Sequence, residues 1–164
     1  MASVFSQFDE ACMALAFEEA CLARDEGNLP IGCVISCRGE IVGRGHNRVV
    51  CPTYHPGRHA ECEALCSVSD SLWAEARHMV LYTTLEPCIM CMGKIILHAV
   101  GRVLFGAVDR RGGSTSLLRH LPSYYDLGGV PQWDGPFDPE RFDPLYDEVN
   151  QRFQGLPCAV VQGV

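Results

Sequence analysis

The chain has 164 residues, of which 48% are hydrophobic and 20% are charged, and this composition suits one domain with a buried core. No apolar run approaches the roughly 18 residues of a membrane-spanning helix, and the first residues lack the pattern of a secretory signal, so we expect a cytoplasmic protein. The net charge is -7, and the excess of acidic residues is greatest in residues 122–150, which contain seven acidic side chains and one basic side chain, Arg141. This acidic segment argues against a polyanionic partner.

The N-terminal part of the chain predicts a helix followed by a β-hairpin. Ser6 can cap a helix that runs to about Arg24, because apolar residues recur there at three- and four-residue spacing. Two apolar segments at residues 31–37 and 40–45 flank residues 38–39, whose Arg-Gly pair is typical of a tight turn. We therefore expect two adjacent antiparallel strands.

The middle of the chain predicts a loop, a helix, and then a strand, helix and strand. Residues 47–58 contain Pro and Gly without an apolar period, so they lead as a loop to a helix that begins near His59. Residues 79–84 and 102–107 are short β-rich runs on either side of a helical stretch at residues 88–99. Strand, helix and strand in this order imply a parallel right-handed crossover.

The C-terminal part is the least regular. Residues 122–139 read as an extended loop that could cover a substrate, residues 142–153 as an amphipathic helix, and residues 158–161 as a short late strand. The fold class that we predict is α/β, a three-layer α/β/α sandwich around a central mixed five-stranded sheet. Residues 1–164 are expected to form one domain, of which residues 110–164 close the pocket.

The cysteine count does not indicate a disulfide scaffold. The chain has ten cysteines, but such scaffolds are typically short and secreted. For Cys33 and Cys37, core packing is favoured over a redox role. Six cysteines lie in apolar patterned segments, and most of them are expected to be buried thiols: Cys12, Cys21, Cys33, Cys37, Cys62 and Cys66.

Two short motifs carry the chemistry. His59-Ala60-Glu61 and Pro87-Cys88-Ile89-Met90-Cys91 each stand where a helix is expected to begin. One imidazole and two thiolates from His59, Cys88 and Cys91 would give a tetrahedral zinc ion three protein ligands and leave the fourth position open for water. An open position is typical of a catalytic zinc, which lowers the pKa of its bound water to around 7. The sequence thus predicts one Zn²⁺ per chain.

Glu61 is the predicted proton carrier. It follows the ligand His59 by two residues at the start of the same helix, so its carboxylate is expected near the metal without binding it. From there it can take a proton from water and pass it to a ring nitrogen and then to the leaving amine. The pair H-x-E and P-C-x-x-C is the signature of the zinc nucleobase deaminases.

On these residues, the chain resembles the cytidine deaminase-like superfamily over roughly residues 8–110. The resemblance is to the branch of tRNA adenosine deaminases, guanine deaminases and fungal-type cytosine deaminases. It extends to the segments Leu29-Pro30-Ile31-Gly32, Gly43-Arg44-Gly45-His46-Asn47 and Leu81-Tyr82-Thr83-Thr84-Leu85. It implies that Asn47 and the backbone N–H of Ala60 contact the base. It also implies a homodimer, for which the apolar residues 95–97 could supply the surface.

The substrate is predicted from charge. A tRNA editor would be expected to carry basic residues around its site, whereas this chain has one lysine and an acidic segment at residues 122–150. We therefore expect a free nucleobase, nucleoside or related amino-heterocycle of cytosine or guanine type, and no nucleic-acid partner. A tRNA adenosine-to-inosine deaminase is the alternative, and an inactive binding module is the least favoured hypothesis. Glu86 and Asp109 are expected to border the pocket without a catalytic role.

Other interpretations of the same residues stay open at this point. Cys62, Cys66, Cys88 and Cys91 could form a structural zinc site, but this leaves His59 and Glu61 without a role. Asn47 could be a turn residue whose side chain bonds locally. Aromatic residues of the irregular loop could stack on a heterocycle or simply anchor the loop: Tyr124, Tyr125, Trp133 and Phe137. The remaining histidines have no ligand spacing.

Overall fold

A mixed five-stranded sheet forms the centre of the protein. The computed structural model describes residues 5–126 and 129–155, so the strand expected at residues 158–161 lies outside the described part. The strands are β1 (Gly32–Cys37), β2 (Glu40–His46), β3 (Met79–Leu85), β4 (Arg102–Ala107) and β5 (Gln132–Asp134). Their order is β2-β1-β3-β4-β5. β1 is antiparallel to both of its neighbours, whereas β3, β4 and β5 run parallel, which confirms the predicted crossover pairing.

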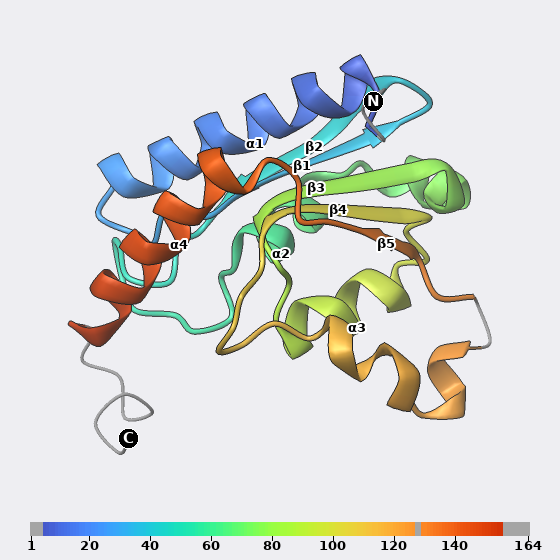
Figure 1. Ribbon diagram of the computed structural model, residues 1–164. Helices are drawn as coiled ribbons and strands as arrows, with labels where there is room; N and C mark the ends of the chain where they lie inside the picture. Colours follow the sequence, from blue (N-terminus) through green and yellow to red (C-terminus); the bar gives the residue numbers. More distant parts are fainter. Residues whose placement is uncertain (1–4, 127–128, 156–164) are drawn as a thin grey trace.

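Helices cover both faces of this sheet and make three layers. They are α1 (Gln7–Asp25), α2 (Ala60–Ser67), α3 (Ile89–Leu97) and α4 (Pro139–Gln154). α1 and α4 lie on one face, and α2 and α3 lie on the other (Figure 1). Short 3₁₀ helices at Asp70–His78, Thr115–His120 and Ser123–Asp126 connect them. The predicted α/β/α sandwich is confirmed.

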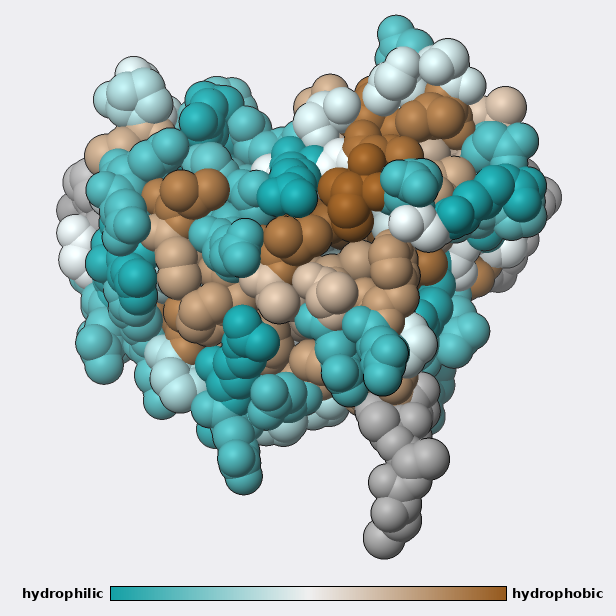
Figure 2. Space-filling view, turned by 90° about the horizontal axis from the view of Figure 1, so that it is seen from above, coloured by the Kyte–Doolittle hydropathy of each residue, from teal (hydrophilic) through white to brown (hydrophobic). Residues whose placement is uncertain are grey.

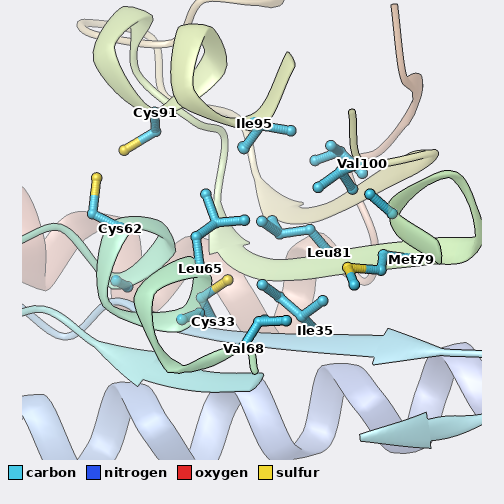
Figure 3. Packing of buried hydrophobic residues seen from close by; sticks show 14 of the residues in the cluster. Cys33, Ile35, Cys62, Leu65, Val68, Met79, Leu81, Cys91, Ile95 and Val100 are labelled. Atoms are coloured by element: carbon cyan, nitrogen blue, oxygen red, sulfur yellow. The ribbon is translucent and has the colours of Figure 1, made fainter. Parts of the chain in front are cut away.

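Two hydrophobic cores follow from the alternation of side chains along the strands. Cys33, Ile35 and Leu81 point toward α2 and α3, where they meet Leu65 and Ile95 (Figure 3). On the other face of the sheet the core is built from residues such as Tyr82, Leu104 and Phe142, which are packed under α1 and α4. Successive residues of a strand face opposite sides of a sheet, so β3 and β4 supply both cores.

The close approach of helices to β1 and β2 depends on glycines. A Cβ atom at Gly32 would lie 2.1 Å from the carbonyl oxygen of Ala16 in α1. A Cβ atom at Gly45 would lie 2.3 Å from the backbone nitrogen of Ala64 in α2. Glycine is the residue that allows backbones to approach this closely. These two positions let the helices pack directly onto the strands that lead to the metal site.

The cysteine prediction is confirmed for most of the chain. The nine cysteines of the described residues are free, and Cys12, Cys33, Cys37, Cys62 and Cys91 are buried. Two of the six expected in apolar segments are exceptions, because Cys21 is half-buried and Cys66 is exposed. No disulfide stabilises the described part of the fold.

The interpretation of residues 122–139 as a loop over the substrate is wrong in part. β5 lies within this segment and extends the sheet, with Trp133 packed against the core under α2 and α3. Phe137 is buried in the other core, where its ring contacts Phe5 and Phe142. These two aromatic residues therefore anchor the segment, whereas Tyr124 is 64% exposed. A three-residue strand is too short to show an alternating pattern in sequence.

The acidic helix α4 lies on the face of the sheet opposite α2 and α3. Figure 2 views the face formed by α1 and α4, where polar side chains surround apolar patches that lie in the middle. Phe8 and Leu22 are exposed large apolar side chains of α1. None of the helices formed by residues 5–126 and 129–155 is long and apolar enough to cross a membrane.

A capping box fixes the start of α1. The backbone N–H of Asp9 donates to Ser6 Oγ over 3.1 Å, and the backbone N–H of Ser6 donates to Asp9 Oδ2 over 3.0 Å. We expect Ser6→Ala to lower the free energy of unfolding by about 1 kcal/mol, since it leaves a helix N–H without its acceptor. Urea denaturation checks this, with the exposed Ser116→Ala as control. Equal stability of the two variants would contradict it.

Candidate metal centre

Three side chains from two helix starts converge on one point. His59 is the N-cap of α2, Cys88 is the N-cap of α3, and Cys91 lies in the first turn of α3. Their ligand atoms all lie within 4.8 Å of one another, and they are the one such set of His, Cys, Asp or Glu found in the described residues. The structure thus brings together the three side chains predicted to bind zinc.

The distances within this set suit a tetrahedral zinc ion. His59 Nδ1 lies 3.5 Å from Cys88 Sγ and 3.6 Å from Cys91 Sγ. With Zn–N of about 2.05 Å and Zn–S of about 2.3 Å, the tetrahedral angle places nitrogen and sulfur about 3.6 Å apart. The donor set therefore fits zinc, and Nδ1 is the imidazole atom that faces the sulfurs.

The electrostatics of the site also favour a cation. A hydrogen bond from Cys91 lowers the pKa of Cys88 to about 4, so this sulfur is a thiolate at neutral pH. Hydrogen bonds to Cys62 and Cys88 raise the pKa of Cys91. Burial lowers the pKa of His59, but the hydrogen bond with Cys88 and the charge of Glu61 outweigh it and raise the pKa to about 9. A divalent cation would neutralise these clustered negative groups and allow both sulfurs to ionise.

Glu61 lies beside the ligands without joining them. Its side chain is 4% exposed, and burial raises the pKa of its carboxyl group. Cys91 Sγ lies 3.4 Å from Glu61 Oε2, and Thr83 Oγ1 donates to Oε1 over 3.4 Å. A buried carboxylate next to a metal site, and outside its ligand set, is positioned to transfer protons. Thr83, at 0% exposed in β3, is a contact that sequence reasoning missed.

Asn47 directly follows β2 and is buried. Its Oδ1 accepts the backbone N–H of Val49 over 3.1 Å, and its own N–H donates to the carbonyl of Ile31 over 2.9 Å. The locally bonded turn that the sequence left open is therefore present, and a contact between Asn47 and a base stays a prediction. Ala60, the first residue of α2, is completely buried.

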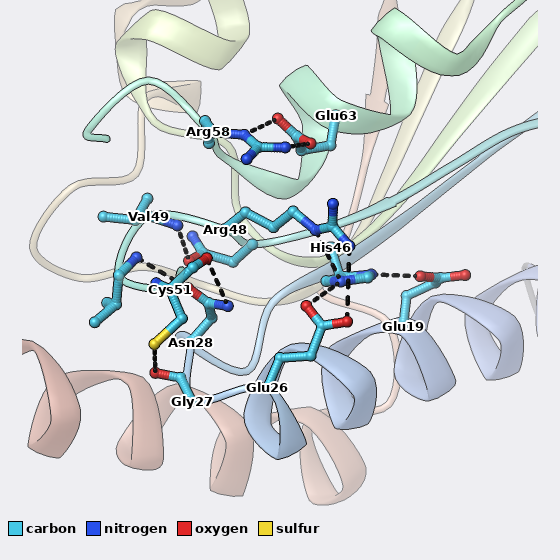
Figure 4. A network of polar contacts seen from close by, with 12 residues as sticks. Glu19, Glu26, Gly27, Asn28, His46, Arg48, Val49, Cys51, Arg58 and Glu63 are labelled. Atoms are coloured by element: carbon cyan, nitrogen blue, oxygen red, sulfur yellow. Dashed lines mark hydrogen bonds and ion pairs between the residues drawn. The ribbon is translucent and has the colours of Figure 1, made fainter. Parts of the chain in front are cut away.

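Side chains of α1 and of the turn after α1 hold the end of β2 and the loop that follows Asn47. Asn28 Oδ1 accepts the backbone N–H groups of Val50 and Cys51 over 2.9 and 2.8 Å (Figure 4). In the same network, His46 lies between the carboxylates of Glu19 and Glu26, 2.9 and 3.0 Å from its two ring nitrogens. These contacts hold the end of β2 in place.

The four-cysteine site is not formed. Cys62 and Cys91 point toward each other from α2 and α3 (Figure 3), but Cys66 is exposed and its sulfur accepts a hydrogen bond from Lys94 over 3.3 Å. His98, which follows α3, packs its ring against Trp73 at 4.8 Å and bonds to the carbonyl of Lys94. His98 is not part of the set of ligand atoms formed by His59, Cys88 and Cys91.

Sequence reasoning missed the contacts that a second loop makes with the zinc helix. Ser114 Oγ donates to the carbonyl oxygen of Pro87 over 2.7 Å, and Gly113 pairs with Cys88 in an isolated β-bridge. The sequence signal, Gly112-Gly113-Ser114 after a strand, is typical of any surface loop. Pro87 directly precedes Cys88, the N-cap of α3.

Comparison with known proteins identifies the family. The family model for the cytidine and deoxycytidylate deaminase zinc-binding region matches residues 6–107, which contain the three metal-site residues and Glu61. The chain belongs to this deaminase family. It is accordingly a zinc-dependent hydrolytic deaminase with one zinc ion, and the cytidine deaminase-like fold seen in the sheet is that of the family.

Two relatives of this deaminase, and one similar solved structure, are named for the deamination of adenosine in tRNA. A Bacillus subtilis protein named tRNA-specific adenosine deaminase is 38% identical over 69% of this chain and 70% of its own length. A protein of the same name from Aquifex aeolicus is 36% identical over 76% of this chain and 83% of its own. A structure solved in a study of A-to-I editing by tRNA:A34 deaminases superposes with a TM-score of 0.69 at 26% identity, over 85% of this chain and 99% of that one.

These relatives overturn the expectation of a free cytosine- or guanine-type substrate with no nucleic-acid partner, which is wrong. The expectation rested on the single lysine and on the acidic segment at residues 122–150, without knowledge of where that segment lies in the fold. Four of its seven acidic residues (Glu140, Asp143, Asp147 and Glu148) belong to α4, and this helix lies on the face of the sheet opposite α2 and α3, whose starts form the metal site (Figure 1). The acidity of α4 therefore belongs to a different face of the protein from the starts of α2 and α3.

The segment expected to supply a dimer surface is also different from the prediction. Ile95 and Ile96 are 0% and 6% exposed, because they pack into the core of this chain. The exposed apolar side chains of α3 are Ile89, Met90 and Leu97. Of the predicted residues 95–97, only Leu97 can contact a second copy, and the homodimer stays a prediction.

Proposed function

We propose that this chain is a tRNA adenosine deaminase, which hydrolyses the C6–amine bond of an adenosine in tRNA to give inosine and ammonia. The observation that carries the proposal is the combination of a complete metal site with 36–38% identity to proteins named tRNA-specific adenosine deaminase. In this proposal His59, Cys88 and Cys91 hold the zinc ion, and Glu61 moves the protons. Residues 1–164 act as one domain in the cytoplasm.

Zinc supplies Lewis acidity at this site, which makes a water molecule acidic enough to react at neutral pH. Glu61 accepts a proton from that water on its buried carboxylate as the oxygen bonds to C6. It gives this proton to the ring nitrogen. It then takes the remaining proton from the hydroxyl group now bonded to C6 and gives it to the amine as the C–N bond breaks. Water and adenosine are consumed, and inosine and ammonia are released, so atoms and charge balance.

Asn47 and Ala60 are proposed to orient the base. An enzyme of this chemistry must take the target base out of its stack and read its polar edge. Asn47 stands at the end of β2 with its backbone and Oδ1 fixed by Ile31 and Val49, so its amide has one orientation. The backbone N–H of Ala60 lies between the ligand His59 and Glu61, next to the reacting atoms.

Basic side chains near the metal helix support an RNA substrate. Arg110 and Arg111 are exposed in the loop whose Gly113 pairs with Cys88. Arginine forms strong bidentate contacts with phosphate oxygens. This loop could therefore neutralise the RNA backbone beside the site, even though the net charge of the chain is -7.

The test is to incubate the purified zinc protein with tRNA transcripts and to measure inosine by nuclease digestion and mass spectrometry. Free adenosine, cytosine and guanine are run beside the tRNA, and ammonia is measured in each. We expect inosine in tRNA and no turnover of the free compounds. Glu61→Gln protein purified in the same way serves as control for contaminating deaminases. Ammonia from a free base without inosine in any tRNA would refute the proposal.

A further inference from the structure

A buried carboxylate next to the metal site has no part in the mechanism above. Glu86 follows β3 directly, precedes Pro87 and the ligand Cys88, and is 6% exposed. Its Oε2 accepts the backbone N–H of Asp109 over 3.1 Å, and its Oε1 accepts the backbone N–H of Thr115 over 3.0 Å. The hydroxyl of Thr115 also donates to Oε1. All of these donors come from the two ends of one loop, residues 109–115.

The same loop is bonded to the backbone on the other side of Glu86. Ser114 directs both its N–H and its hydroxyl to the carbonyl oxygen of Pro87, over 3.1 and 2.7 Å. Gly113 forms the isolated bridge with Cys88. The loop therefore closes around the Glu86 side chain while its middle part lies against the residue that starts α3.

The packing between loop and carboxylate leaves no space. A Cβ atom at Gly113 would lie 2.3 Å from Glu86 Oε2 and 2.6 Å from the carbonyl oxygen of Asp109. Only glycine fits here, so the bridge between Gly113 and Cys88 depends on the position of the Glu86 carboxylate.

Cys88 is held from both sides in the sequence, and on the α3 side its carbonyl oxygen accepts the backbone N–H of Met92 over 2.8 Å. It is the N-cap of α3, and its side chain makes no capping hydrogen bond because its sulfur faces His59 instead. Before it, the chain is anchored through Glu86, whose N–H donates to the carbonyl of Ala107 over 2.8 Å. The contacts of the Glu86 segment and of the loop that follows β4 thus hold the backbone of Cys88 in place, while its sulfur contacts His59 and Cys91.

We propose that Glu86 is a positioning residue for the zinc ligand Cys88, because its carboxylate holds the loop of residues 109–115 against the start of α3. This inference rests on the zinc site of the proposed function, but not on the identity of the substrate. The role requires a carboxylate, because two N–H groups and one hydroxyl all donate to it. An amide would turn an NH₂ group toward one of these donors and lose a contact.

The experiment compares Glu86→Gln with Thr115→Ser, which keeps both donors of Thr115. Zinc affinity is measured by competition with a chromophoric chelator, and cobalt replaces zinc for an absorption spectrum of the ligand geometry. We expect Glu86→Gln to raise the apparent Kd for zinc by about tenfold to a hundredfold, since changes beside the ligands commonly have this effect. Its cobalt bands should shift, whereas Thr115→Ser should match the parent protein.

A stability control separates positioning from general destabilisation. Val149→Ala removes buried methyl groups in α4, on the opposite face of the sheet. We expect it to lower Tm without changing zinc affinity or the cobalt spectrum. Unchanged zinc affinity in folded Glu86→Gln would overturn the proposal. It would also be overturned if Val149→Ala, with the same Tm as Glu86→Gln, lost as much zinc affinity as that variant. If Glu86→Gln does not fold, Ser114→Ala tests the loop contact by the same two measurements.

The two proposals fail in different ways. Loss of zinc affinity in Glu86→Gln supports the positioning role even if no tRNA is edited, because neither measurement contains RNA. Inosine formation with unchanged zinc affinity in Glu86→Gln would support the proposed function and refute the role of Glu86.

Discussion

Replacing Glu61 by glutamine is expected to reduce the rate of inosine formation by about a thousandfold or more, with zinc content unchanged. The amide has nearly the same shape as the carboxylate and can keep the hydrogen bond from Thr83. It cannot accept a proton at neutral pH, so the transfer from water to the ring nitrogen and the amine is lost. A thousandfold change corresponds to about 4 kcal/mol of transition-state stabilisation.

Three measurements distinguish this result from misfolding. Elemental analysis should give the same zinc content as in the parent protein, since Glu61 is outside the ligand set. The Tm should not fall. Burial raises the pKa of the Glu61 carboxyl group because it disfavours the charged form, so a neutral amide at this buried position should cost little stability. Single-turnover assays at saturating protein should show the loss in the chemical step. A Glu61→Gln protein with parental turnover would show that another group carries the protons.

Replacing Cys88 by alanine is expected to remove both zinc and activity. The site offers three protein ligands, and two ligands would hold the ion far less tightly. Cys88 is also the group whose pKa is lowered to about 4, so the variant loses the sulfur that is ionised most readily. His59→Ala should have the same outcome, since its Nδ1 faces both sulfurs.

The matched control is Cys62→Ser. Cys62 is a buried cysteine that points toward Cys91 from α2, but it is not part of the metal-ligand set (Figure 3). Its variant should keep one zinc ion per chain and its activity, whereas Cys88→Ala should contain none after dialysis against a weak chelator. Stoichiometric zinc in both Cys88→Ala and His59→Ala would place the metal elsewhere. Zinc loss in Cys62→Ser would give this residue a role in the site.

Features of the fold that depend on residues close together in sequence agree with the prediction. The start of α1 at Ser6, the tight turn at residues 38–39 and the helix starts at His59 and Cys88 were all predicted from sequence. Each of these features depends on side chains within a few residues. At the turn, for example, Arg38 and Gly39 both have positive φ, as a two-residue hairpin requires.

The predictions that were wrong concern features that depend on contacts between segments far apart in the sequence. β5 has three residues and becomes a strand only because β4 offers it a free edge. Ile95 and Ile96 were predicted to supply an apolar dimer surface, but they are buried in the core of this chain. The acidic helix α4 was weighed against an RNA substrate, although the fold places it on the opposite face from the metal site.

The sequence by itself determined the chemistry of this protein, because the ligand types, the glutamate and their spacing at helix starts specify a zinc deaminase wherever the fold brings them together. Only the tertiary structure decided which surface surrounds that chemistry. It sets α4 apart from the metal site, and it closes the loop of residues 109–115 around Glu86 beside Cys88. The physical reason is that hydrogen bonding and burial join residues by position in space, and a pattern along the chain carries that information only over a few residues.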